Sequence, residues 1–365
     1  MRQPKTIEPP SYNAHAVGIW LYTLFLLVFI MVLIGGLTRL TDSGLSITDW
    51  SPVKGMFPPM SYLEWLSLFN KYKETSEFIV QNNTMTLEEF KYIFWWEWGH
   101  RQFGRLIGAT WLIGIIWLSC ITRIPRSLMK SFMVLGLLGS LQAVIGWWMV
   151  KSGLSEEKTM LDVASYRLAI HLSLALIILS VIYALININR SWNVLPKVKV
   201  DPKKKNSQET LTNIMLGLFF LQVFLGALVS GIDAGLSYSD WPLMNGRVIP
   251  EDLFYLNPWH LNFLENPALV QFNHRLMGYC ILVFGLILWV RGITLGTSNR
   301  NQIIKYHSLF FVLALQVVLG ILAVLMSVPL ILGLAHQLVA MLLLLCILNL
   351  KFSLSAERKI KALNS

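Results

Sequence analysis

The sequence predicts an all-α polytopic membrane protein with eight transmembrane helices. They form two tandem four-helix bundles related by a pseudo-two-fold axis along the membrane normal. Two observations lead to this fold class: a strongly apolar composition and a set of motifs that occurs twice. Of the 365 residues, 55% are hydrophobic and 14% are charged, and the mean hydropathy is +0.57. Such a composition excludes a water-soluble enzyme.

Eight apolar runs are each long enough to cross a bilayer as a helix, which takes about 20 residues. All are rich in Leu, Ile and Val and uncharged through their centres, as transmembrane helices are. They lie at residues 17–38, 102–122, 130–150, 167–188, 211–231, 270–291, 304–326 and 329–350.

The distribution of basic residues predicts the orientation, because Lys and Arg collect on the cytoplasmic side of membrane proteins. An even number of spans places both termini on one side. The tails and loops of that side hold 18 of the 30 Lys and Arg residues but 4 of the 20 Asp and Glu residues. Both termini are therefore expected in the cytoplasm or the mitochondrial matrix. The net charge of +10 then follows from topology and calls for no nucleic acid.

Four motifs occur twice along the chain, in the same order. The copies are 165 to 191 residues apart. First copy and then second, they are DxGLSxxDW at 42–50 and 233–241, an HR pair at 100–101 and 274–275, LQxxxG at 141–146 and 315–320, and a single histidine at His171 and His336. The duplication predicts an N-terminal half at residues 1–190, a polar cytoplasmic linker at 191–209 and a C-terminal half at 210–365. Four spans per half make this a parallel repeat.

The first half alone has a long outer loop. It is predicted to run for about 60 residues, from Arg39 to Gly99, and to contain an amphipathic stretch at Tyr62–Tyr72. The DxGLSxxDW copies, one in this loop and one after the fifth span, are interpreted as structural. Their glycines permit a turn, and their tryptophans suit the membrane interface.

Four histidines are the strongest candidates for chemistry: His100, His171, His274 and His336. They are expected in the first turns of the even-numbered spans, at one depth in the outer leaflet, two per half. A single intramembrane histidine is more often a packing residue, but a repeated pair suits axial ligation of one haem in each half. Copper or zinc would usually need further ligands, and none recurs with both pairs.

A carboxylate distinguishes the two halves. Glu97 lies three positions before His100, on the same helix face, whereas Gln271 holds the equivalent position before His274. The first half can therefore do acid–base or cation-stabilising work that the second cannot. The alternative interpretation is that Glu97 is an exposed charge at a helix N-terminus.

Four arginines accompany the histidines, and their forked donors suit the carboxylates of haem propionates. The alternative is that they extend to the outer interface and bind nothing. They are Arg101, Arg105 and Arg167 in the first half and Arg275 in the second.

Taken together, these motifs resemble the haem A synthase family along nearly the whole chain. The resemblance is carried by GGLTRLTDSGLS at 35–46, ExxHR at 97–101, His171, the second DxGLSxxDW, NHR at 273–275 and His336. Some family members carry a cysteine pair in the first outer loop. This chain has none there, since its cysteines are Cys120, Cys280 and Cys346. It resembles the cysteine-free branch found in mitochondria and alphaproteobacteria.

The resemblance implies an oxidoreductase of the bacterial or mitochondrial inner membrane that oxidises the C8 methyl of haem O to a formyl group. It implies that His274 and His336 ligate a haem b cofactor, that His100 and His171 flank the substrate haem O, and that Glu97 is the catalytic carboxylate. Implied partners are haem O synthase, cytochrome oxidase assembly factors, an electron-transfer partner and membrane lipid; a homo-oligomer stays open.

Two other functions stay open at this point. A diheme b-type electron-transfer cytochrome would explain the four histidines equally well, and only the contrast between Glu97 and Gln271 separates it from a haem-modifying enzyme. A haem transporter or chaperone would suit a parallel repeat, although the spans lack the paired broken helices typical of a transport site.

Overall fold

The structure is a computed structural model that describes residues 12–51, 53–154, 162–192, 207–296 and 299–363. Within these ranges it is helical, without a β-strand. The long helices are α1 (Ala14–Leu40), α4 (Leu87–Ile121), α5 (Arg126–Gly153), α6 (Ser165–Ser191), α7 (Ser207–Gly231), α9 (Pro267–Arg291), α10 (Arg300–Leu325) and α11 (Leu330–Leu363). Eight described helices are long and apolar enough to span a membrane, and they coincide with the eight predicted runs. The all-α membrane fold is confirmed.

Shorter elements connect the long helices. They are the α-helices α2 (Tyr62–Tyr72), α3 (Ser76–Val80) and α8 (Asn262–Glu265), the 3-10 helices η1 (Lys54–Met56), η3 (Ala234–Leu236) and η4 (Trp259–Leu261), and the π-helical turn η5 (Gly292–Gly296). The predicted linker at 191–209 falls almost entirely outside the described residues.

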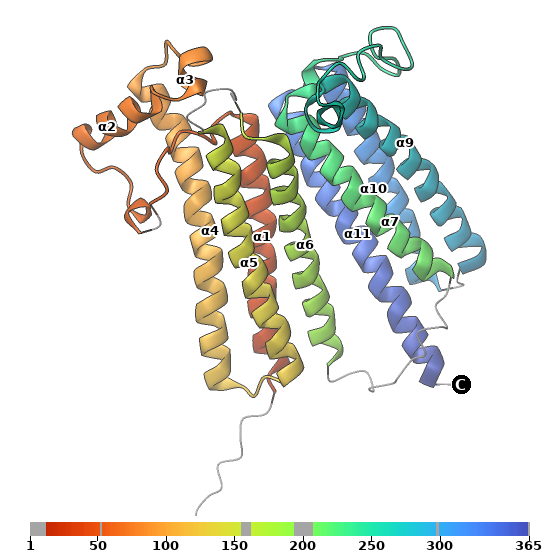
Figure 1. Ribbon diagram of the computed structural model, residues 1–365. Helices are drawn as coiled ribbons and strands as arrows, with labels where there is room; N and C mark the ends of the chain where they lie inside the picture. The colour runs from red at the N-terminus through yellow and green to blue at the C-terminus, as the bar shows by residue number, and fades with distance from the viewer. Residues whose placement is uncertain (1–11, 52, 155–161, 193–206, 297–298, 364–365) are drawn as a thin grey trace, which may run out of the picture.

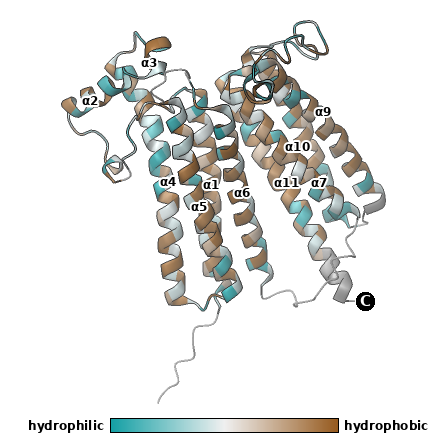
Figure 2. Cartoon of the chain, viewed as in Figure 1, coloured by the Kyte–Doolittle hydropathy of each residue, from teal (hydrophilic) through white to brown (hydrophobic). Residues whose placement is uncertain are grey.

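The long helices stand in two groups of four (Figure 1). One group contains α1, α4, α5 and α6, and the other contains α7, α9, α10 and α11, an arrangement compatible with the predicted tandem bundles. The first described turn of α1 and the last turns of α11 lie at the same end of the molecule. The outer elements α2 and α3 lie at the opposite end. Most residues of the long helices are hydrophobic (Figure 2), as transmembrane helices require.

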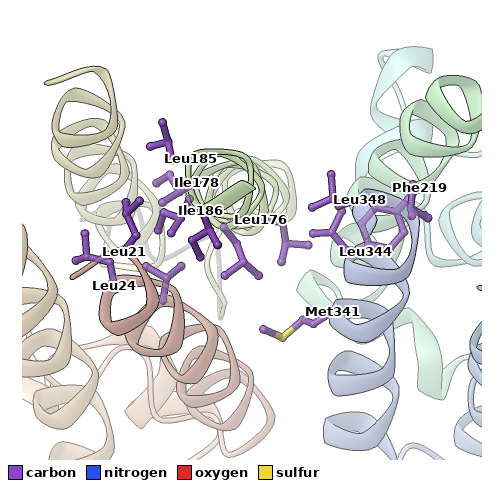
Figure 3. Close-up of a cluster of buried hydrophobic side chains, with 14 of the residues drawn as sticks. Leu21, Leu24, Leu176, Ile178, Leu185, Ile186, Phe219, Met341, Leu344 and Leu348 are labelled. Atoms are coloured by element: carbon purple, nitrogen blue, oxygen red, sulfur yellow. The ribbon is translucent and has the colours of Figure 1, made fainter. Parts of the chain in front are cut away.

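The two groups pack against each other through α6 with α7 and α1 with α11. Many of their buried apolar side chains belong to one continuous cluster. Figure 3 shows side chains of α1 and α6 on one side, among them Leu21 and Ile186, and side chains of α7 and α11 on the other, among them Phe219 and Leu344. This cluster fixes the relative placement of the inner helices.

Helix α4 begins 15 residues before the predicted span, which corrects the predicted extent of the outer loop. A capping box starts it: the Thr86 hydroxyl accepts from the Glu89 amide, and the Glu89 carboxylate accepts from the Thr86 amide. His100 therefore lies thirteen residues into its helix, and the expectation that it sits in the first turn or two is wrong. His171 and His336 do lie in the second turns of α6 and α11.

The first outer loop folds into a small subdomain on the outer part of α4. Helix α2 matches the predicted Tyr62–Tyr72 stretch and begins with a capping box of Ser61 and Glu64. Its Phe69 and Tyr72 are buried against Phe90 of α4. The predicted amphipathic stretch is therefore a helix. Its apolar face covers the part of α4 that precedes the predicted span.

Candidate functional site

Each predicted histidine lies against a glycine on a neighbouring helix. A Cβ atom placed on any of these glycines would come within 2.8–3.2 Å of the imidazole Cε1, closer than side chains normally pack. The pairs are Gly35 of α1 with His100 of α4, Gly146 of α5 with His171 of α6, Gly226 of α7 with His274 of α9, and Gly320 of α10 with His336 of α11. Glycine therefore makes the space in which each imidazole lies.

A glutamine lies one helical turn before three of these glycines and contacts the same histidine. The Nε2 atom of Gln142 is 3.2 Å from Nδ1 of His171, and that of Gln316 is 3.1 Å from Nε2 of His336. Gln222 Nε2 is 3.5 Å from Nε2 of His274. The repeat of LQxxxG at 141–146 and 315–320 is evident in the sequence, whereas the same motif at 221–226 was missed. That third copy could have been found by searching every span for the motif.

The structure brings the histidines together in the expected pairs: His100 lies near His171, and His274 lies near His336. The Nδ1 atoms of His100, His274 and His336 are buried, and none has a hydrogen-bond partner among the described residues. Buried polar atoms are normally satisfied, so such rings are available to a ligand. The described residues hold no cluster of three or more His, Cys, Asp or Glu side chains that could bind a bare metal ion, whereas a pair of imidazoles suits axial ligation of an iron porphyrin.

Glu97 is buried, with 3% of its surface exposed, and its carboxylate is fully engaged. Its Oε2 accepts hydrogen bonds from the Ser46 hydroxyl and the Ile47 amide, both at 2.8 Å. Its Oε1 forms a salt bridge of 2.5 Å with Arg101. The alternative interpretation of an exposed interfacial charge at a helix N-terminus is therefore wrong. Arg101 and two loop donors instead stabilise a buried negative charge one turn from His100.

Gln271 occupies the equivalent place in the second half. It donates hydrogen bonds to the neighbouring loop, whereas Glu97 accepts them. Its Nε2 donates to the carbonyls of Ala234 and Tyr238, at 2.8 and 3.2 Å, and its Oε1 accepts from Arg275 at 3.0 Å. Both residues thus join the duplicated DxGLSxxDW segment to the histidine helix. The structural role is shared, while the negative charge belongs to the first half alone.

Arg101 and Arg275 both contact the loop that contains the DxGLSxxDW segment of their own half. Arg101 also donates to the Ile47 carbonyl, and Arg275 donates to the carbonyls of Tyr238, Asp240 and Leu243. The Nε of Arg275 is buried and has no partner within the described part of the chain.

The other two predicted arginines have different surroundings. Arg167 stacks over Trp148, with Cζ 4.5 Å from the ring centroid, and donates to the Trp148 carbonyl. Arg105 lies beside Gly55 of the first outer loop, since a Cβ on that glycine would be 3.4 Å from Nη2. Arg101, Arg105 and Arg275 therefore contact loop residues, whereas Arg167 contacts α5.

Known proteins match this chain along most of its length. The family model described as cytochrome oxidase assembly protein (COX15-CtaA) matches residues 18–348. A haem A synthase of Roseobacter denitrificans is 44% identical over 352 residues, which cover 96% of this chain and 91% of the relative. One from Ruegeria pomeroyi is also 44% identical, with 96% and 92% covered. One from Paracoccus denitrificans is 43% identical over 337 residues, with 92% and 86% covered.

Identity at this level, over nearly the full length of both chains, establishes common ancestry and a common fold. The matched region includes all or most of each of the eight spans, both histidine pairs and Glu97. The chain belongs to the COX15-CtaA family of cytochrome oxidase assembly proteins.

Proposed function

We propose that the chain is a haem A synthase that oxidises the C8 methyl of haem O to a formyl group, and that the chemistry takes place in its N-terminal half. One observation carries the placement: Glu97 is a buried carboxylate beside one histidine pair, and the otherwise equivalent Gln271 is uncharged. Relatives that cover 92–96% of the chain are named haem A synthases, which supports the reaction.

In this proposal His100 and His171 hold haem O in the N-terminal half, and His274 and His336 hold a resident haem b in the C-terminal half. The glycine opposite each imidazole allows the ring to approach the neighbouring helix without a Cβ in its way. A bound haem supplies an iron centre that exchanges electrons one at a time. The chain's own residues orient the substrate, carry charge and move protons.

Glu97 is the proposed catalytic carboxylate. With water as the source of the oxygen atom, oxidation of a methyl group to a formyl group releases protons, and its electrons pass to the electron-transfer partner. A nearby fixed negative charge lowers the energy of the positive charge that develops. Arg101, Ser46 and Ile47 keep the carboxylate in one position, so it need not reorganise during the reaction. Gln271 can hold the same segment but cannot provide that charge.

The four arginines are proposed to bind the propionate groups, with Arg101, Arg105 and Arg167 serving haem O and Arg275 serving haem b. Guanidinium donors match carboxylates in geometry and charge. The buried Nε of Arg275 supports this role, because it has a donor to spare after its contacts with the outer segment.

We further propose that the chain resides in the bacterial or mitochondrial inner membrane, with both termini in the cytoplasm or matrix. The excess of Lys and Arg in the corresponding loops supports this orientation. Haem O synthase would supply the substrate, cytochrome oxidase assembly factors would receive the product, and an electron-transfer partner would accept the electrons released.

The function is tested by expressing the chain in a host that makes haem O but no haem A, and then identifying the extracted haems by chromatography and mass. Haem A is expected only when the chain is present. Haem O left unmodified by a purified protein that still carries haem b would instead support the diheme electron-transfer cytochrome.

A further inference from the structure

The loop between α1 and α2 carries an apolar surface that no other part of the described chain covers. Its stretch from 53 to 63 has one charged residue, Lys54, and no carboxylate. Contiguous exposed apolar side chains usually mark a contact with a membrane or with another protein. Five large side chains of this stretch, called here the outer apolar surface, are 50–83% exposed: Val53, Met56, Phe57, Met60 and Leu63.

A hydrogen bond to α4 places this loop beside the membrane-spanning part of the helix. The carbonyl of Gly55, in the 3-10 turn η1, accepts from Nε2 of Gln102 at 2.7 Å. Gln102 is the first residue of the predicted apolar span and lies two residues beyond His100. The loop therefore reaches down to the depth of the first histidine pair. Figure 1 shows the chain between α1 and α2 running alongside α4.

A second contact, to α5, gives the same depth. Trp50 stacks on Trp147, with the ring centroids 5.0 Å apart. Trp147 lies six residues before the end of α5, which is about 9 Å along the helix, and it directly follows the glycine that faces His171. Tryptophan side chains collect at membrane–water interfaces. The loop is thus attached to both α4 and α5 at the level where the interface is expected.

The outer apolar surface adjoins a side of α4 that is itself apolar and exposed. Gly55 lies beside Arg105, since a Cβ on the glycine would be 3.4 Å from Nη2. The next residue of α4, Leu106, is 48% exposed, and Ile113, two turns further along, is 65% exposed. Exposed apolar side chains of a membrane-spanning helix face the acyl chains of the lipid. Lipid that covers Leu106 therefore lies next to the loop as well.

We infer that the outer apolar surface is inserted into the lipid leaflet opposite the chain termini, at the boundary between headgroups and acyl chains. Segments of this kind bury their apolar side chains about 5–10 Å into that boundary. Lys54 suits the same position, because its apolar stem can lie among the acyl chains while its ammonium reaches the lipid phosphates. Lipid contact on one side and α4 and α5 on the other hold the loop in place. The inference rests on the membrane-spanning fold and is independent of the proposed reaction.

The test measures the depth of spin labels in the full-length protein. The native Cys120, Cys280 and Cys346 are replaced by alanine, and a single cysteine is introduced for the label by Phe57→Cys. Glu74→Cys, in the exposed connection between α2 and α3, is the water reference, and Ile113→Cys is the lipid reference. Each protein is placed in vesicles of phosphatidylethanolamine and phosphatidylglycerol. Electron paramagnetic resonance then compares collisions with oxygen, which concentrates in lipid, and with a water-soluble nickel chelate.

The ratio of oxygen to nickel collisions at Phe57→Cys should be several-fold higher than at Glu74→Cys and should approach that of Ile113→Cys. If Phe57→Cys fails to fold, Met60→Cys reports on the same surface. A label as open to the nickel chelate as the one at Glu74→Cys would overturn the inference and leave a water-soluble protein partner as the occupant. A label shielded from both reagents would overturn it too, because a second copy of the chain would then cover the surface.

Discussion

The guanidinium of Arg39, at the end of α1, donates from one nitrogen to both carboxylate oxygens of Asp233 in the other half, each at 2.9 Å. The same guanidinium donates to Asp42 at 2.6 Å and to the Ser230 carbonyl at 3.1 Å. Asp42 and Asp233 are the first residues of the two DxGLSxxDW copies, and both adopt left-handed backbone angles, with φ of 46° and 50°. One arginine thus binds both copies and joins the halves at their outer ends.

Arg39→Ala should destabilise the junction between the halves. It would leave Asp42 and Asp233 near Asp162 without the cation that they share. Hydrogen bonds to charged groups contribute about 1.5–3 kcal/mol each when buried, and the partial exposure of these aspartates reduces the expected loss to about 1–2 kcal/mol. Thermal unfolding in detergent measures it. Ser230→Ala is the control, because only the Ser230 backbone is used, and equal melting temperatures for both variants would contradict the account.

Gly226→Ala should lower the haem b content of the purified protein. The new Cβ would lie 2.8 Å from Cε1 of His274, so the imidazole must move away from its position. Pyridine haemochrome spectra give the haem content per chain. Gly217→Ala on the same helix has open space around its Cβ and should leave the content unchanged while stabilising α7 by up to about 1 kcal/mol. Equal haem loss in both variants would refute the steric explanation.

The outer subdomain should lose stability as the pH rises. Burial raises the pKa of Glu77 from its ordinary 4.5 to about 8, and its carboxyl accepts a hydrogen bond from the Tyr72 hydroxyl at 3.2 Å. The folded subdomain therefore binds this proton more tightly than the unfolded one, so its stability falls between pH 4.5 and about 8 and then levels off. Hydrogen exchange of residues 62–94, corrected for intrinsic rates, should show more opening at pH 9 than at pH 6.

Two substitutions distinguish the titration of Glu77 from the titration of other groups in the subdomain. Glu77→Gln removes the ionisable group while keeping a side chain of the same shape, and it should flatten the pH dependence. Glu74→Gln changes an exposed residue of the same segment and should keep it. A subdomain whose opening depends on pH equally in all three proteins would show that Glu77 is not the group responsible.

Local patterns were enough to predict the spans and α2, because apolar length and amphipathic spacing are properties of the sequence itself. The early start of α4 was missed because Glu88, Glu89 and Lys91 lower its hydropathy. The capping box of Thr86 and Glu89 was nevertheless readable in the letters. The full set of glycine positions was also readable once all four helices were compared.

The environments of Glu77 and Arg39 depend on tertiary packing, which no local sequence pattern reveals. Glu77 lies in a polar loop, where carboxylates are normally exposed, and its burial follows from the contacts of Tyr72 and Asn82. Arg39 has no counterpart in the repeat, because Ser230 occupies the equivalent position. Its contact with Asp233 requires the two halves to be side by side, and residues 194 apart meet only in the folded chain.

The central claim is that the haem-modifying chemistry belongs to the N-terminal half and depends on the charge of Glu97. The most direct measurement is the ratio of haem A to haem b in membranes that contain Glu97→Gln or Gln271→Glu. Each variant gives its position the side chain that the other half has naturally. Glu97→Gln should lower haem A formation by about 100-fold or more at unchanged haem b content, and Gln271→Glu should still form it. Undiminished haem A with Glu97→Gln would contradict the claim.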